Sequence, residues 1–105
     1  MTKKTGKATD DELQELADIF RLLGDANRLK IITACLDSEK SVGDIAEVVG
    51  ISQPLVSHHL RLLKAARLVA HKKQGKQGFY ALSADHVRCV LVDMLHHVNK
   101  IKKEL

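Results

Sequence analysis

The chain has 105 residues, 45% of them hydrophobic, which is enough for one compact domain. Two cysteines cannot form a disulfide framework or a thiolate zinc knuckle, and three aromatic residues are too few to stack on single-stranded nucleic acid. The formal net charge is +4. No apolar run reaches the length of a membrane span or a signal peptide, so we expect a cytoplasmic protein with no membrane partner.

The N-terminal segment predicts a short tail followed by a helix. Residues 1–8 are basic and polar, and we expect a flexible basic tail ahead of one domain over residues 9–105. Thr9 and Glu12 have the spacing of a capping box, in which each side chain bonds the backbone N–H of the other residue. Apolar residues then recur at helical spacing until Gly24, so we expect the first helix to end there.

Two further helices are predicted next along the chain. Asp25 can cap a second helix over residues 26–36. The apolar face of that helix consists of Leu29, Ile32 and Leu36. Ser41 can cap a third helix over residues 42–49, and Gly50 can end it in the left-handed conformation that glycine tolerates.

A fourth helix follows after a very short turn. Ser52 can cap this helix, which runs to about residue 65. On a helical wheel its polar arc consists of Gln53, Pro54, Ser57, His58 and Arg61, and its apolar arc consists of Leu55, Val56, Leu60, Leu62 and Leu63. His59 lies within the apolar arc, so we expect it to be buried and hydrogen-bonded. Two helices joined by so short a turn predict a helix-turn-helix.

The hydrophobic period changes in the last third of the chain. Residues 69–73 and 78–82 read as two short strands, and residues 74–77 read as the turn between them. Ser83 can cap a last helix over residues 84–103, which has apolar residues along one side. Five helices and one hairpin predict a small α+β domain that is mostly helical.

The charge is distributed unevenly along the chain. Between Val48 and Ala84 there is no Asp or Glu. The bases of this segment are Arg61, Lys64, Arg67, Lys72, Lys73 and Lys76. The remaining residues carry eleven bases and thirteen acids. A basic segment without carboxylates, formed by one helix and a hairpin, favours contact with double-stranded DNA.

Three motifs resemble those of ArsR/SmtB-type winged-helix repressors. The first is the Ser52-Gln-Pro-Leu-Val-Ser-His-His-Leu-Arg-Leu-Leu-Lys64 segment, which is similar to the recognition helix of that family. Residues 22–31 and 75–82 match the family in order and spacing, and the resemblance covers roughly residues 13–99. It implies a winged helix-turn-helix homodimer that dimerises through its first and last helices. It also implies a repressor that an inducer releases from an inverted-repeat operator.

The resemblance and the charge pattern together give the candidate DNA contacts. The resemblance places Ser52, Gln53, Ser57, His58 and Arg61 on the bases and backbone of the operator. Basic and polar residues beyond them can reach phosphates, namely Lys64, Lys72, Lys73, Lys76 and Gln77. We expect the second group to add affinity more than sequence preference.

The resemblance also suggests where an inducer would bind. One metal site of the family needs a cysteine pair on the third helix, and residues 42–49 contain no cysteine. A second family site lies on the last helix, where its four positions read Ala84, His86, His97 and Lys100. Both histidines are therefore present, and both outer ligands are missing.

The two histidines cannot bind one ion within a single helix. Eleven residues of helix place His86 and His97 roughly 16 Å apart on one face. In an antiparallel pair of helices, His86 of one subunit would meet His97 of the other. Asp85, His86 and His97 are thus candidate ligands for Zn²⁺ or another divalent transition metal, with Asp93 or His96 as a further donor. The alternative is a polar edge of the dimer interface in which the histidines form hydrogen bonds.

Other functions stay open at this point. Cys35 and Cys89 suggest a redox or reactive-sulfur sensor, although Cys35 also suits a small core residue. A winged helix that has become a protein-interaction module is a further alternative. No Ser/His/Asp set, Cys/His set or phosphate-binding glycine loop is present, so an enzyme is not expected.

Overall fold

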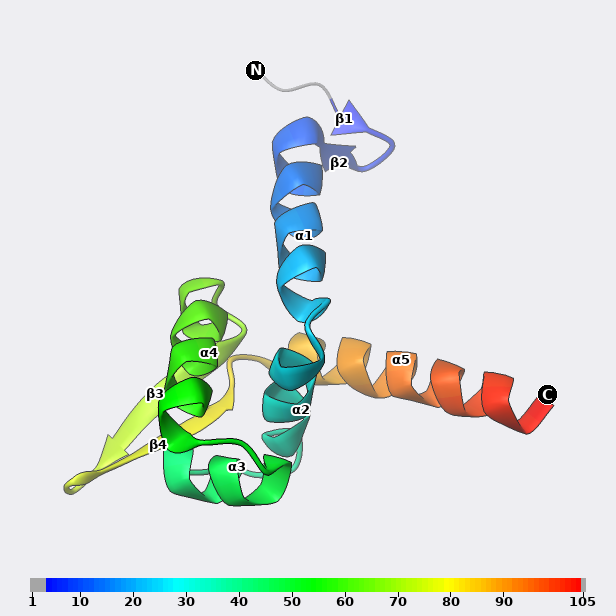
Figure 1. The fold of residues 1–105 in the computed structure, drawn as a ribbon. Helices are drawn as coiled ribbons and strands as arrows, with labels where there is room; N and C mark the ends of the chain where they lie inside the picture. Colours follow the sequence, from blue (N-terminus) through cyan, green and yellow to red (C-terminus); the bar gives the residue numbers. More distant parts are fainter. Residues whose placement is uncertain (1–3, 105) are drawn as a thin grey trace.

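The computed structural model describes residues 4–104 and contains the five predicted helices and the predicted hairpin (Figure 1). In chain order the elements are β1 (Lys4–Thr5), β2 (Ala8–Thr9), α1 (Asp10–Leu23), α2 (Ala26–Ala34), α3 (Val42–Val49), α4 (Gln53–Ala65), β3 (Val69–Gln74), β4 (Gln77–Leu82) and α5 (Asp85–Glu104). Among these described helices, none is long and apolar enough to cross a membrane. The α+β class is confirmed, and the antiparallel β3–β4 hairpin is hereafter called the wing.

The segment before α1 forms a hairpin that the sequence did not predict. β1 and β2 pair antiparallel, with Lys4 opposite Thr9 and Thr5 opposite Ala8. Gly6 lies in the turn with a positive φ of 62°. Residues 1–3 of the predicted tail lie outside the described part of the chain, and the flexibility of residues 1–8 stays a prediction.

Four helices begin at the caps that the sequence predicted. Thr9 and Glu12 form the reciprocal capping box, with distances of 2.8 and 3.1 Å, and these bonds lower the pKa of the Glu12 carboxyl. The side chains of Asp25, Ser41 and Ser52 each accept a hydrogen bond from the backbone N–H three residues further on. Each such cap contributes about 1 kcal/mol to stability.

The predicted cap and start of α5 were wrong. The helix begins at Asp85, one residue later than expected, and it continues to Glu104. The Ser83 hydroxyl instead donates to the Arg67 carbonyl at 2.6 Å, and the Ser83 N–H donates to the Leu68 carbonyl at 3.0 Å. Ser83 therefore closes the base of the wing against the end of α4.

The predicted boundary and apolar face of α2 also need correction. The helix ends at Ala34, because the N–H groups of Cys35 and Leu36 bond carbonyls only three residues back, which tightens the last turn. Its buried side chains are Ile31 and Ile32, whereas Leu29 is 39% exposed. Of the predicted face, Ile32 is fully buried and Leu36 packs against the core, so only Leu29 was wrong. Ile31 is buried in its place because this side of α2 faces α3 and α4.

The core lies between α2, α3, α4 and the base of the wing. Its members are Ile31, Ile32, Cys35, Ile45, Ala46, Val56, Leu60, Leu63, Leu68, Val69, Leu82 and Leu91. α1 contributes no buried residue, and α5 contributes only Leu91 among its described side chains. Both helices extend away from the body formed by α2, α3 and α4 (Figure 1).

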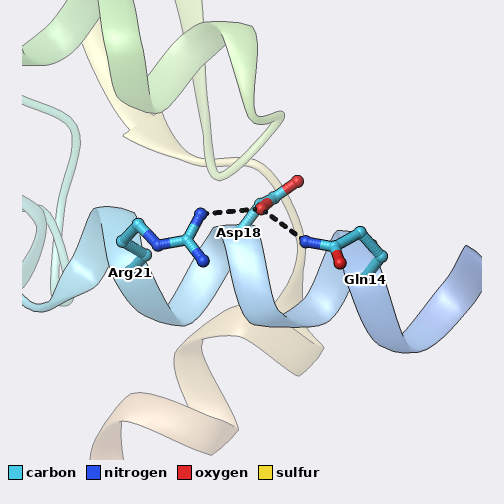
Figure 2. A network of polar contacts seen from close by, with 3 residues as sticks. All are labelled: Gln14, Asp18 and Arg21. Atoms are coloured by element: carbon cyan, nitrogen blue, oxygen red, sulfur yellow. Dashed lines mark hydrogen bonds and ion pairs between the residues drawn. The ribbon is translucent and has the colours of Figure 1, made fainter.

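The two outer helices each have an apolar side that stays exposed within residues 4–104. On α1 the exposed side chains are Leu13, Leu16 and Phe20, and on α5 they are Val90, Val92, Met94, Leu95, Val98 and Ile101. The other side of α1 is polar: Asp18 accepts hydrogen bonds from Gln14 and Arg21, both at 3.1 Å (Figure 2). Exposed apolar stripes of this extent indicate a surface for protein association.

Candidate nucleic-acid interface

The turn between α3 and α4 sets the direction of the candidate recognition helix. Gly50 ends α3 at a positive φ of 75°, and its N–H donates to the Ala46 carbonyl at 2.9 Å. Ser52 then caps α4 only two residues later. A residue with a Cβ would be strained at this φ, so a glycine at position 50 favours this tight turn. The predicted helix-turn-helix is confirmed.

α4 buries one side and leaves the predicted contact side open. The buried side consists of Val56, His59, Leu60 and Leu63. The exposed predicted contacts are Ser52, Gln53, His58, Arg61 and Lys64, while Ser57 is half-buried. Leu55, which the wheel placed in the apolar arc, is 38% exposed, whereas Val56 beside it is fully buried. The helix therefore has a polar surface without any carboxylate of its own.

His59 is buried and bonded, as the sequence predicted. Only 6% of the residue is exposed, and Arg28 Nε of α2 donates to His59 Nδ1 at 3.2 Å. Arg28 also donates from Nη1 to the Leu22 carbonyl at 3.1 Å. Burial lowers the pKa of His59; the Arg28 charge acts in the same direction and the Asp25 carboxylate opposes it. The neutral imidazole thus ties α4 to α2 and to the end of α1.

We predict that this histidine makes the domain less stable in mild acid. The unfolded chain binds a proton on His59 below about pH 6.5, whereas the folded chain resists it, so the free energy of unfolding falls as the pH drops below that value. Urea unfolding between pH 7.5 and roughly pH 5.5 should show this slope. His59→Gln, which keeps an acceptor for Arg28, should flatten the slope, and His58→Gln on the exposed side should not. An equal slope in both variants would contradict the assignment.

The wing is longer and its turn tighter than predicted. β3 and β4 are paired from Val69 opposite Leu82 to Gln74 opposite Gln77. The loop therefore contains only Gly75, with a φ of 63°, and Lys76. The predicted four-residue turn was wrong because a glycine at the first loop position permits a two-residue connection. Lys72, Lys73, Lys76 and Gln77 are all exposed.

A cleft joins the wing to the start of the helix-turn-helix. Gln53 of α4 lines it together with Lys76 and Gln77 of the wing. Its remaining lining residues are Ser41, Val42, Gly43, His71, Gly78 and Tyr80. The structure thus brings Gln53 into one hollow of the surface with Lys76 and Gln77, which lie more than twenty residues further along the chain.

Comparison with known proteins identifies the family. The protein-family model described as "Bacterial regulatory protein, arsR family" matches residues 25–71. The regulator KmtR of Mycobacterium tuberculosis is 40% identical over 84 residues, which are 80% of this chain and 65% of KmtR. The transcriptional repressor SmtB homologue of Synechocystis is 32% identical over 90 residues, which are 86% of this chain and 68% of that protein.

The chain belongs to the ArsR family. A homodimeric winged helix-turn-helix DNA-binding domain from Mycobacterium bovis has the same fold, with a TM-score of 0.84 at 20% identity, and the match covers 96% of each chain. The family model describes regulatory proteins, and KmtR and the SmtB homologue are named as a transcriptional regulator and a transcriptional repressor, which confirms the prediction that the chain is not an enzyme. KmtR is longer, and the chain spans 65% of its length.

The candidate metal ligands are not gathered within one chain. His86 and His97 are exposed on α5, and the Asp85 carboxylate pairs with Arg88 at 2.8 Å. His97 shares its surface with Asp93, His96, Asn99, Lys100 and Lys103. No group of three His, Cys, Asp or Glu side chains that could hold an ion is found between residues 4 and 104. A site formed by these residues would therefore need donors from a second subunit.

The two candidate thiols lie in opposite environments. Cys35 is fully buried in the core, and burial raises the pKa of its thiol while the charge of Lys40 acts in the opposite direction. Cys89 is exposed on α5. Since a thiol reacts as the thiolate, only Cys89 is accessible for that chemistry in this ArsR chain.

Sequence reasoning missed two residues that hold the interface in place. Arg28 supports α4 through His59, which lies 31 residues away in sequence. Glu39 contacts the wing through Gln74, which lies 35 residues away. Both residues lie on elements that precede the interface, and no local pattern links them to it. Only the tertiary structure reveals these contacts.

Proposed function

We propose that the chain is a transcriptional repressor that binds double-stranded DNA as a homodimer and leaves it when an inducer binds. The observation that carries this proposal is the exposed side of α4, which continues into the basic wing without a carboxylate between Val48 and Ala84. An acid-free helix of this kind can enter the major groove while the wing reaches the flanking phosphates. Membership of the ArsR family supports the proposal.

The proposed roles divide between the two elements. Ser52, Gln53, Ser57, His58 and Arg61 would contact base edges and the nearby backbone. Lys64 and the wing residues Lys72, Lys73, Lys76 and Gln77 would contact phosphates. The cleft shared by Gln53, Lys76 and Gln77 supports a single path for the DNA backbone between α4 and the wing.

The dimer would form through α1 and α5. Their exposed apolar side chains, with Phe20 at 59% and Met94 at 55%, would be covered by the second subunit. A two-fold dimer presents two α4 helices, which explains the expectation of an inverted-repeat operator with half-sites one or more DNA turns apart.

The test is selection from a pool of random-sequence duplexes. The retained sequences should contain an inverted repeat, and binding should weaken steeply with salt because several Lys and Arg side chains displace counterions. Failure of the chain to retain any duplex at low salt would contradict the proposal and favour a protein-interaction module.

The inducer that the α5 surface supports best is a divalent transition metal such as Zn²⁺. His86 and His97 are exposed along one line of α5, and Asp93 precedes His97 by one turn. His86 of one subunit and His97 of the other would hold the ion, and Asp93 would donate an oxygen or orient the imidazole. Asp85 contributes only if it leaves Arg88, while Lys100 on the same surface opposes a dication.

We expect Zn²⁺ to weaken DNA binding by this dimer. The coupling should be about 5- to 150-fold in affinity, the usual range for linked sites, and DNA should weaken metal binding by the same factor. His97→Ala should abolish the effect, and Asn99→Ala on the same helix, which removes no candidate ligand, serves as the matched control. Metal binding without any change in DNA affinity would contradict the metal as inducer.

The exposed thiol of Cys89 supports a second candidate inducer, an oxidant or a reactive sulfur species. In that case peroxide or persulfide should weaken DNA binding by the unmodified chain and leave Cys89→Ser unaffected. An equal response in the variant would exclude Cys89 as the sensor, because Cys35 is buried.

A further inference from the structure

One carboxylate from outside the basic segment reaches the wing. Glu39 lies in the connection between α2 and α3, nine residues before the acid-free segment begins. Its Oε1 accepts a hydrogen bond from Gln74 Nε2 at 2.9 Å, and its Oε2 lies 4.0 Å from Lys72 Nζ. Lys72 and Gln74 lie two residues apart in β3, so their side chains are on the same side of the wing.

The position of Glu39 is fixed by backbone pairing next to it. Lys40 pairs with Tyr80 of β4 in an antiparallel bridge. The Lys40 backbone N–H donates to the Tyr80 carbonyl with an N···O distance of 2.9 Å, and the Tyr80 N–H donates to the Lys40 carbonyl at 2.7 Å. The Lys40 ammonium also donates to the Ala34 carbonyl at 2.5 Å. The connection is thus a short third edge of the wing, and this pairing does not depend on the charge of Glu39.

The carboxylate lies where it can compete with DNA. Lys72 is a proposed phosphate contact, and in the free protein its nearest described anion is Glu39. When the wing approaches a duplex, Lys72 can pair with a phosphate only by giving up or sharing this carboxylate, and Glu39 itself is repelled by phosphate. The side chains of Lys72 and Glu39 are 63% and 35% exposed, so solvent screens their attraction and the effect is modest.

We propose that Glu39 is an intramolecular competitor for phosphate that lowers the affinity of the wing for the DNA backbone. The inference rests on the proposed function, since it assumes that Lys72 contacts DNA. By weakening a contact that carries no sequence information, Glu39 reduces sequence-independent binding.

The test uses Glu39→Gln, because the amide oxygen still accepts the bond from Gln74 while the negative charge is removed. Binding is measured to a random-sequence duplex that spans two half-sites, over a series of NaCl concentrations. Glu39→Gln should bind this DNA roughly two- to fivefold more tightly at low salt, the range of an exposed ion pair. The slope of log affinity against log salt should steepen by up to about one counterion.

Two comparisons separate the specific pair from a general change in charge. Asp37→Asn removes the same charge from the same connection, and Asp37 has no hydrogen bond or ion pair to the wing among the described residues, so it should have a smaller effect. In a Lys72→Ala background, Glu39→Gln should raise affinity much less, because only the direct repulsion between the carboxylate and phosphate is then removed. Thermal unfolding of each variant establishes that the fold is intact.

The outcomes distinguish this inference from the proposed function. If the unmodified chain fails to bind the duplex, the proposed function fails first. If the unmodified chain binds and Glu39→Gln binds equally or more weakly, Glu39 does not compete and the inference is overturned. A gain that persists in full in the Lys72→Ala background, or that Asp37→Asn reproduces in full, overturns it as well.

Discussion

Val98→Glu should convert the protein into a monomer that no longer binds its operator. Val98 is 47% exposed in the apolar stripe of α5, and the second subunit would cover it. An unpaired carboxylate in such an interface costs about 3–5 kcal/mol, which weakens dimerisation by more than about 100-fold. A single subunit presents only one α4 helix, so the affinity gained from two linked half-sites is lost.

Sedimentation and DNA-binding measurements on the same samples check this expectation. The matched control is Asn99→Glu, which adds a carboxylate at the next residue, on the polar side of α5 beside Asp93 and His96. The control should stay dimeric and bind DNA. Val98 contributes little to the fold of one subunit, so the monomer should keep its helical circular dichroism. A dimeric Val98→Glu variant with normal operator binding would show that the subunits associate through a different surface.

The features predicted correctly from the sequence are those that depend on neighbours in the chain. The caps at Thr9, Asp25, Ser41 and Ser52 each need one side chain and a backbone N–H three residues away, so a local pattern is sufficient. The turn at Gly50 is local in the same sense. The exposed side of α4 followed from helical periodicity, which fixes the buried side of any helix that covers a core.

The features that the sequence did not predict depend on tertiary packing. Ile31 of α2 is buried and the predicted Leu29 is exposed, because packing against α3 and α4 decides which side of α2 is covered. The bond from Arg28 to His59 and the contact of Glu39 with the wing connect residues more than thirty positions apart. A carboxylate-free segment in the sequence therefore does not guarantee a carboxylate-free surface, and the fold places one acid beside the wing.

Arg61→Ala should reduce the preference for the operator over random DNA. Arg61 is exposed on the open side of α4, in line with Gln53 and Ser57 at intervals of about one turn. An arginine that donates two hydrogen bonds to a guanine discriminates by about 1–3 kcal/mol, which corresponds to roughly 5- to 150-fold in operator affinity. Affinity for random duplexes should fall only by the contribution of one lost interaction between a positive charge and phosphate. The ratio of operator affinity to random-duplex affinity therefore reports whether Arg61 recognises a base.

Two further variants make this ratio interpretable. Lys64→Ala, one turn further along α4, should weaken binding to operator and random duplex alike, because a phosphate contact carries no sequence information. Arg21→Ala removes an equal charge from α1, where Arg21 bonds Asp18 on the polar side, and should leave the ratio unchanged (Figure 2). If Arg61→Ala behaves like Lys64→Ala, then Arg61 is a backbone contact. Base reading by α4 would then depend on its first two turns, where Gln53, Ser57 and His58 are the remaining donors.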